Sequence, residues 1–114
     1  MLPTSNRLNL AKSFRFLKKE GQPLATPYFT VLYLFRGDGV AKAGFVVSNK
    51  VGGSVMRNLF RRRLRELVHH QLDTLPAGLE MVLIARPQTE PPTYEKLSLE
   101  FNKILPKLSP RLRP

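Results

Sequence analysis

The sequence contains no cysteine and no long apolar run. The absence of cysteine excludes disulfides, thiolate zinc sites and cysteine nucleophiles. No stretch approaches the roughly 20 apolar residues of a membrane-spanning helix, and residues 1–10 lack the apolar core of a signal peptide. With 114 residues, 42% of them hydrophobic, the chain has the size and composition of about one folded domain. We therefore expect a single cytoplasmic domain over residues 1–114, with a frayed tail over residues 108–114.

Acidic residues are scarce in the first two-thirds of the chain. Residues 1–72 hold 13 Lys and Arg against three acids, whereas residues 73–114 hold six against five. The net charge of +11 is therefore concentrated in one part of the molecule. Such asymmetry predicts a basic face for a polyanion. Nucleic acid is the favoured partner, and an anionic membrane surface is the alternative.

Catalytic motifs are also missing. The chain has no Gly-x-Ser-x-Gly elbow, P-loop or dinucleotide-binding loop. His69 and His70 are adjacent, which does not fit a helical zinc pair at i and i+4. The acids are scattered singly, so a two-metal site is not expected. The sequence predicts no catalytic residue and no metal ligand.

Glycine and proline divide the chain into alternating helices and strands. The strand over residues 42–48 is expected to form a hairpin with the preceding strand, across a turn at residues 37–39. Ser54 and Thr93 are expected to cap the helices that follow them. The pattern as a whole predicts an α+β sandwich. Helices are expected over 10–20, about 55–72 and 94–105, and strands over 28–35, 42–48 and 80–85.

The central helix concentrates arginine in the stretch "RNLFRRRLRE". At about 100° per residue, one narrow apolar arc should face the core. A ridge of arginines lies beside this arc, with an asparagine and a further arginine next to the ridge, and Arg63 falls on the opposite flank. The arc contains Met56, Phe60, Leu64 and Leu67, the ridge contains Arg57, Arg61 and Arg65, and Asn58 and Arg62 complete the stripe.

A solvated helix face is the simplest explanation of a charge run, but such faces normally mix both signs. Here no acid occurs between Lys50 and Arg65. Phosphates would relieve the repulsion, and the planar guanidinium can bond two phosphate oxygens at once. Gly52 and Gly53 precede the helix and would let backbone approach a phosphate closely. Two glycines before a helix are equally compatible with a simple flexible joint.

The stretch "GFVVSNKVGGSVMRNLFRRRLRE" (residues 44–66) resembles the signature of the bacterial ribonuclease P protein component. In that family a strand is followed by a Lys-Val-Gly loop and a helix that opens with Arg-Asn-Arg. The segments "NRL", "SFRF", "VLY" and "LEMVLIARP" also resemble the family, so the similarity covers nearly the whole chain.

The resemblance implies a two-layer α-β sandwich of order α-β-β-β-α-β-α, like the second domain of a small-subunit ribosomal protein. It also implies a left-handed β-α-β crossover, against the usual right-handed rule. The implied function is that of the protein subunit of ribonuclease P. This subunit binds a catalytic RNA, which acts with magnesium, and holds the 5′ leader of precursor tRNA. The resemblance implies no cofactor bound by the protein alone and no required protein partner.

Site residues follow from the resemblance position by position. The aromatic residue Phe14 matches one that contacts the leader, Tyr33 matches a strand aromatic facing the same cleft, and Arg15 is expected nearby. Core packing is the alternative for Phe14 and Tyr33, and for Tyr33 the two interpretations are balanced. The residues expected to bind the catalytic RNA are Lys50, Arg57, Asn58, Arg61, Arg62 and Arg65.

The chain departs from the family pattern at several positions. Leu59 replaces the last arginine of Arg-Asn-Arg, and Asn49 and Gly53 make the loop less charged than usual. Lys18 stands where many relatives have a second cleft aromatic. Contact of the leader with Phe14 is therefore better supported than a platform of two aromatics.

Two other classes of function remain open. A ribosomal or DNA-binding module would also carry a basic helix, but a DNA reader places base-reading side chains beside its phosphate contacts. Here the exposed face is almost all arginine. A membrane-surface helix needs a broad apolar face that can enter lipid, whereas the narrow arc of this helix suits packing on the strands.

Overall fold

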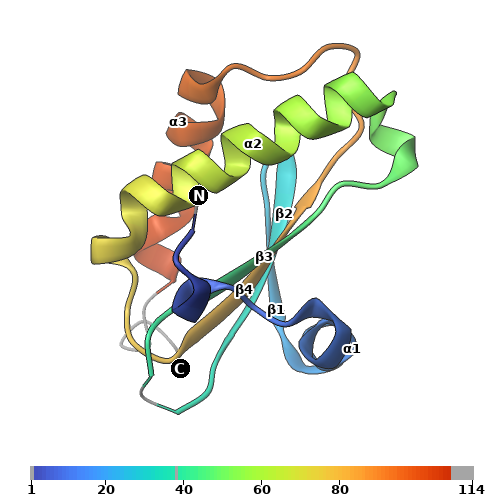
Figure 1. The fold of residues 1–114 in the computed structure, drawn as a ribbon. Helices are drawn as coiled ribbons and strands as arrows, with labels where there is room; N and C mark the ends of the chain where they lie inside the picture. The colour runs from blue at the N-terminus through green and yellow to red at the C-terminus, as the bar shows by residue number, and fades with distance from the viewer. Residues whose placement is uncertain (1, 38, 109–114) are drawn as a thin grey trace.

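The computed structural model describes residues 2–37 and 39–108. Within these residues, three helices and four strands follow each other in the expected order α-β-β-β-α-β-α (Figure 1). Short 3₁₀ turns lie between several of them. The elements are α1 (Leu10–Glu20), β1 (Gln22–Ala25), β2 (Phe29–Phe35), β3 (Lys42–Val46), α2 (Ser54–Gln71), β4 (Leu79–Ala85) and α3 (Tyr94–Ile104).

The four strands form one sheet in the order β1-β2-β4-β3. β2 is antiparallel to both β1 and β4, and β3 is parallel to β4. The expected hairpin between residues 28–35 and 42–48 is therefore wrong, because β4 lies between these strands. β4 is largely buried on both faces, as its unbroken apolar run indicated, and this makes it the natural central strand.

Strand β1 has no clear signal in the sequence pattern. It follows directly after Gly21, at the end of α1, and it contains Pro23. Proline cannot donate a hydrogen bond to a neighbouring strand, so it is tolerated only at a sheet edge. β1 occupies such an edge and pairs only with β2.

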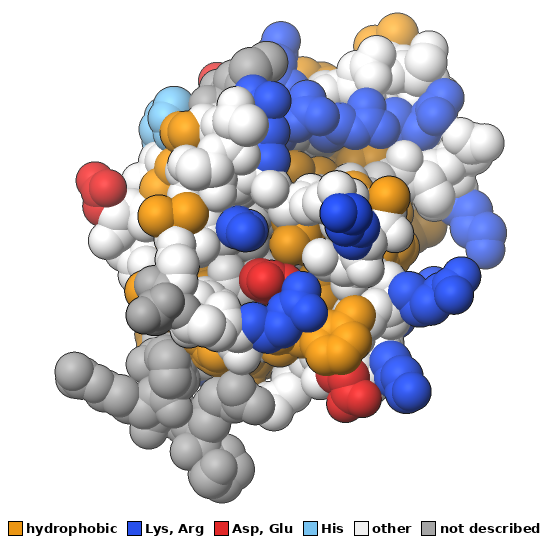
Figure 2. Space-filling model, turned by 60° about the horizontal axis from the view of Figure 1, so that its bottom comes forward, with side chains coloured by type: hydrophobic (Ala, Val, Ile, Leu, Met, Phe, Trp, Pro, Cys, Tyr) orange, Lys and Arg blue, Asp and Glu red, His pale blue; other side chains and the backbone are white. Residues whose placement is uncertain are grey.

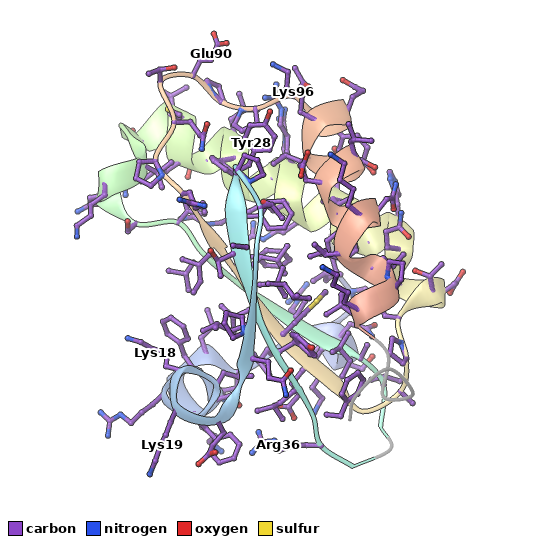
Figure 3. The ribbon with its side chains drawn as sticks, turned by 180° about the vertical axis from the view of Figure 1, so that it is seen from behind. Lys18, Lys19, Tyr28, Arg36, Glu90 and Lys96 are labelled. Atoms are coloured by element: carbon purple, nitrogen blue, oxygen red, sulfur yellow. The ribbon has the colours of Figure 1, made fainter. Side chains whose placement is uncertain are left out.

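Helices cover both faces of the sheet. α2 and α3 lie on one face and α1 on the other (Figures 1 and 3). The larger core lies under α2 and includes Phe60, Leu64 and Leu67, all fully buried, as the apolar arc predicted. A smaller cluster joins Leu17 of α1 to the opposite face of the sheet.

The N-terminal segment lies along the free edge of β3. The backbone N–H of Leu8 donates to the carbonyl of Ala43 at 3.0 Å, and Arg7 forms a parallel bridge with Ala43. The side chain of Asn6 donates to the carbonyl of Ala41 at 2.8 Å. These bonds hold the N-terminal segment against β3, where the chain passes from the α2 face of the sheet to the start of α1.

Of the two predicted helix caps, one is confirmed and the other is wrong. Thr93 caps α3, accepting a hydrogen bond from Lys96 N at 3.2 Å, as predicted. At α2, however, Gly53 occupies the cap position and Ser54 is already helical. The expected fraying is wrong at Leu108, which is only 1% exposed and packs in the larger core. The rest of that tail, residues 109–114, lies outside the described residues.

Candidate nucleic-acid interface

The entry into α2 depends on glycine. Gly52 has φ of +152°, and a Cβ there would meet Met56 Sδ at 2.8 Å. No acidic residue lies in the first turn of α2, and no side chain caps it. The first backbone N–H groups of α2 therefore have no carboxylate partner among the described residues.

Two asparagines orient two arginines of the ridge. Arg57 Nη1 donates to Asn49 Oδ1 at 2.8 Å, and Arg61 Nη1 donates to Asn58 Oδ1 at 3.1 Å. An amide oxygen holds a guanidinium in place without neutralising its charge. Asn49, one of the departures from the family pattern, thus removes a loop charge but orients the neighbouring Arg57.

The other cations of the stripe are unpaired. Lys50, Arg62 and Arg65 are exposed. Among the described residues, none offers their side chains a hydrogen bond or an ion pair. The ion pairs within the same part of the chain, Arg36–Glu80 and Lys103–Glu100, lie on other elements. The stripe is thus a surface of positive charge that no described acidic residue pairs with.

Arg63 lies on the opposite flank of α2 and has a different role. Its Nη1 donates to the carbonyl of Pro92 at 2.6 Å, which attaches α2 to the segment before α3. The guanidinium is therefore directed away from the stripe. Arg63 therefore does not occupy the place in the stripe of the arginine that Leu59, which is half-buried, replaces.

Positive charge gathers in two regions of one side of the molecule. Figure 2 shows Lys and Arg side chains in a row over α2, in a second group around α1 and singly between the two. Because α1 and α2 cover opposite faces of the sheet, the two groups are separated by its β3 edge (Figure 1).

A shallow groove runs along one face of α1, and its lining includes Phe14 and Arg15. Phe14 is half-buried and packs against the smaller core, while Arg15 is exposed. Lys18 Nζ lies 5.0 Å from the centroid of the Phe14 ring, within cation–π range. Figure 3 shows that Lys18 and Lys19 extend from α1 away from the sheet. The residues lining the groove are Leu10, Ala11, Phe14, Arg15, Lys18 and Lys19.

Tyr33 does not face this groove, and the expectation that it shares a cleft with Phe14 is wrong. Successive residues of a strand point to opposite faces. Leu34 faces α1, so Tyr33 faces α2 and α3, where it is only 5% exposed and belongs to the larger core. Its hydroxyl donates to Gln22 Oε1 at 3.2 Å. The alternative of core packing holds for Tyr33.

The contact between Phe16 of α1 and Arg36 was not predicted from the sequence. Phe16 is 41% exposed, and the Arg36 guanidinium lies 4.8 Å from its ring centroid. Arg36 in turn pairs with Glu80 at 2.8 Å. These three residues are brought together by the sheet, so no local sequence pattern could have revealed the cluster.

The described residues hold no group of three or more His, Asp or Glu that could bind a metal ion. Within the same residues, no helix is both long enough and apolar enough to cross a membrane. His69 and His70 are exposed, and His70 Nδ1 lies 2.7 Å from the Tyr94 hydroxyl.

Comparisons with known proteins agree over most of the chain. The model of the family Ribonuclease P matches residues 2–109. The ribonuclease P protein component of Acidothermus cellulolyticus is 37% identical over 112 residues, covering 96% of this chain and 92% of the relative. That of Streptomyces griseus is 35% identical over 118 residues, covering 95% of each chain.

Solved structures show the same fold. The RNase P protein from Thermotoga maritima, in complex with 1-(4-fluorophenyl)-2-thiourea, superposes with a TM-score of 0.82 at 28% identity. The match covers 90% of this chain and 100% of that one. The shared fold includes the connection from β3 through α2 to β4, for which the resemblance implied a left-handed crossover.

Proposed function

The chain belongs to the ribonuclease P protein family, and on that premise we propose how it serves as a subunit in the maturation of tRNA 5′ ends. The α2 stripe binds the catalytic RNA. The groove along α1 holds the 5′ leader of precursor tRNA. The catalytic centre lies in the RNA partner, and magnesium acts through that RNA.

The observation that carries this proposal is the uncompensated charge of α2. Lys50, Arg62 and Arg65 are exposed without a protein partner among the described residues, and Arg57 and Arg61 are held only by amide oxygens. A phosphate backbone would pair these cations and release counterions. The stripe offers a single amide side chain, Asn58, and that amide is engaged with Arg61. This composition favours contact with phosphates over readout of bases.

The groove along α1 suits a single strand of variable sequence. Phe14 offers an aromatic face, and Arg15, Lys18 and Lys19 add positive charge around it. Stacking of bases on aromatic rings tolerates every base, and it contributes roughly 1–3 kcal/mol per base. The groove therefore fits a leader whose sequence differs between tRNA precursors.

The partners in this proposal are the catalytic RNA and precursor tRNA, and the compartment is the cytoplasm. A protein partner and a membrane are not required, because the arginine stripe and the groove face RNA in this arrangement. The protein's contribution is to bind and position, through Arg57, Arg61 and Phe14 above all.

The test is cleavage of a precursor tRNA by the cognate catalytic RNA at low magnesium, with and without the protein. We expect strong stimulation, because protein cations take over part of the charge neutralisation that magnesium otherwise provides. A variant with Arg57, Arg61 and Arg65 all changed to Gln should lose the stimulation while keeping its fold by circular dichroism. RNA binding without any stimulation of cleavage would instead indicate an RNA-binding module of ribosomal-protein type.

A further inference from the structure

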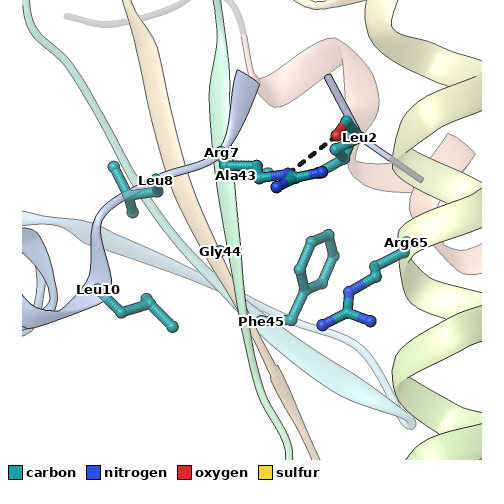
Figure 4. A pocket seen from close by; sticks show the side chains of 8 residues that line it. All are labelled: Leu2, Arg7, Leu8, Leu10, Ala43, Gly44, Phe45 and Arg65. Atoms are coloured by element: carbon teal, nitrogen blue, oxygen red, sulfur yellow. Dashed lines mark hydrogen bonds between the residues drawn. The ribbon is translucent and has the colours of Figure 1, made fainter. Parts of the chain in front are cut away.

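A pocket of about 280 Å³ lies at the free edge of β3, between the start of α1 and α2 (Figure 4). We call it the Phe45 pocket. Figure 4 shows the Phe45 ring at its centre, with Arg65 of α2 beside the ring and Arg7 of the N-terminal segment above it. No acidic side chain is found among the described residues that line it. The lining residues are Leu2, Arg7, Leu8, Leu10, Ala43, Gly44, Phe45 and Arg65.

The two arginines of the pocket could both bind an anion, but they differ in how firmly the protein holds them. Arg7 Nε donates to the carbonyl of Leu2 at 2.9 Å, and no described residue forms a hydrogen bond with either terminal nitrogen of the guanidinium. Arg65 is exposed and, within the described residues, has no hydrogen-bond or ion-pair partner. One guanidinium is thus fixed and the other is free to adjust, and both can form paired bonds to phosphate oxygens.

The wall on the α1 side depends on a glycine. A Cβ on Gly44 would lie 2.6 Å from Leu10 Cδ2, so the close packing of Leu10 over β3 requires glycine at this position. Gly44 faces α1 and Phe45 faces α2, because successive residues of a strand point to opposite faces. Leu10 and Leu8 therefore line the α1 side of the β3 edge, whereas Phe45, which is half-buried, provides an aromatic surface on the α2 side (Figure 4). On the α2 side, an aromatic ring with the apolar Leu2 nearby and two cations at the rim matches a nucleobase with its phosphate.

The pocket also connects the two proposed RNA surfaces. Leu10 lines both this pocket and the groove along α1, and Arg65 belongs to both this pocket and the α2 stripe. The pocket thus lies at the β3 edge that separates the two positive regions. Arg65 makes it a continuation of the stripe, which favours the catalytic RNA over the leader as the source of its ligand.

We propose that the Phe45 pocket holds one unpaired nucleotide of the catalytic RNA, with the base against Phe45 and the phosphate between Arg7 and Arg65. This inference rests on the proposed function, since it assumes that α2 binds the catalytic RNA. It adds a specific nucleotide site to that function. It also assigns the N-terminal segment, through Arg7, to the RNA interface.

The first test measures binding of the full chain to the catalytic RNA alone, without tRNA. Phe45→Leu keeps an apolar side chain but removes the ring, and we expect it to weaken binding about fivefold to tenfold, near the low end of base–aromatic stacking. Arg7→Gln should weaken binding and lower the salt dependence by about one counterion. Both variants should keep the circular dichroism spectrum of the unchanged protein.

Matched controls separate the pocket from general effects. Phe16→Leu makes the same exchange at an exposed site on α1, and Arg86→Gln removes an arginine that also donates to a backbone carbonyl, that of Thr26 at 3.0 Å. We expect both controls to bind the catalytic RNA like the unchanged protein. Losses equal to those of Phe45→Leu and Arg7→Gln would overturn the proposal.

Ultraviolet crosslinking of the unchanged protein gives a readout independent of any variant's folding. Trypsin releases peptide 43–50, and mass-spectrometric fragmentation of this peptide should place a nucleotide from the catalytic RNA on Phe45 and not only on Lys50, which also belongs to the proposed RNA interface. Absence of this crosslink, or its appearance only when precursor tRNA is added, would contradict the proposal. Failure of the proposed function would look different, because the unchanged protein would then either not bind the catalytic RNA or bind it without stimulating cleavage.

Discussion

The guanidinium of Arg63 donates a hydrogen bond of 2.6 Å to the carbonyl of Pro92, 29 residues away along the chain. One arginine in the basic helix is therefore a structural link between α2 and the start of α3. Its neighbours Arg62 and Arg65 have no such link within the described residues. The same residue type thus serves two purposes on two faces of one helix.

Changing Arg63 to Ala should therefore lower stability more than it affects RNA binding. Loss of a hydrogen bond to a charged donor costs about 1.5–3 kcal/mol when the acceptor is left without a partner. We expect a lower midpoint in urea and an unchanged salt dependence of RNA affinity. A reduced salt dependence at full stability would instead place Arg63 in the RNA interface.

Arg61→Ala should show the opposite pattern. Arg61 contacts Asn58 but no carboxylate among the described residues, so its removal should leave the fold intact. Each lost phosphate contact lowers the slope of log affinity against log salt by about 0.7–0.9. Filter binding over a range of salt concentrations measures this slope, with Arg86→Ala as the control for net charge. An unchanged slope would exclude Arg61 from the interface.

Tyr33 provides a test of the corrected placement. Tyr33→Ala should destabilise the protein by about 3–5 kcal/mol, as expected for removal of a large buried aromatic side chain. Tyr33→Phe removes only the bond to Gln22 and should cost about 0.5–1.5 kcal/mol. The discrimination between precursor and mature tRNA should be unchanged in Tyr33→Phe. Selective loss of precursor binding in this folded variant would mean that the hydroxyl reaches the leader.

Alkaline pH should weaken the fold through Tyr94. Burial raises the pKa of the Tyr94 hydroxyl above its ordinary value of 10.0, and the negative charges of Glu66 and Glu95 raise it further. The folded state therefore keeps this proton at a pH where the unfolded chain has lost it. The resulting stabilisation is complete below about pH 10 and disappears as the pH rises through the pKa of the folded state.

Unfolding in urea at a series of pH values from 8 to 11 checks this, by comparing the unchanged protein with Tyr94→Phe. We expect part of the decline above about pH 10 to be absent from the variant, because it carries no titrating hydroxyl. Identical declines in the two proteins would show that Tyr94 does not contribute.

All three helices and three of the four strands could be predicted from the sequence because their signals are local, whereas β1 carries no such signal. The apolar arc through Phe60 and Leu64, the cap at Thr93 and the end of α1 at Gly21 all depend on residues a few positions apart. The topology depends on contacts far apart in sequence. Only the pairing of β4 with both β2 and β3 reveals that the expected hairpin does not form.

The candidate site divides in the same way. The α2 stripe follows from helical periodicity, and the structure arranges Arg57, Arg61 and Arg65 as that periodicity predicts. The side of the sheet on which Tyr33 lies could not be predicted, because strand alternation separates two faces without identifying which helix covers each. Arg7 was missed because a single arginine in an N-terminal segment carries no pattern, and only its bridge to Ala43 brings it to Phe45.

The most direct test of leader binding measures the affinities of the complex of protein and catalytic RNA for precursor tRNA and for mature tRNA. The complex is assembled once with the unchanged protein and once with Phe14→Ala. We predict that the variant binds precursor tRNA more weakly by about 1–3 kcal/mol, the contribution of one stacked base, and binds mature tRNA unchanged. Phe16→Ala on the same helix is the control and should leave both affinities unaltered. Equal losses for precursor and mature tRNA would contradict the account and return Phe14 to a purely structural role.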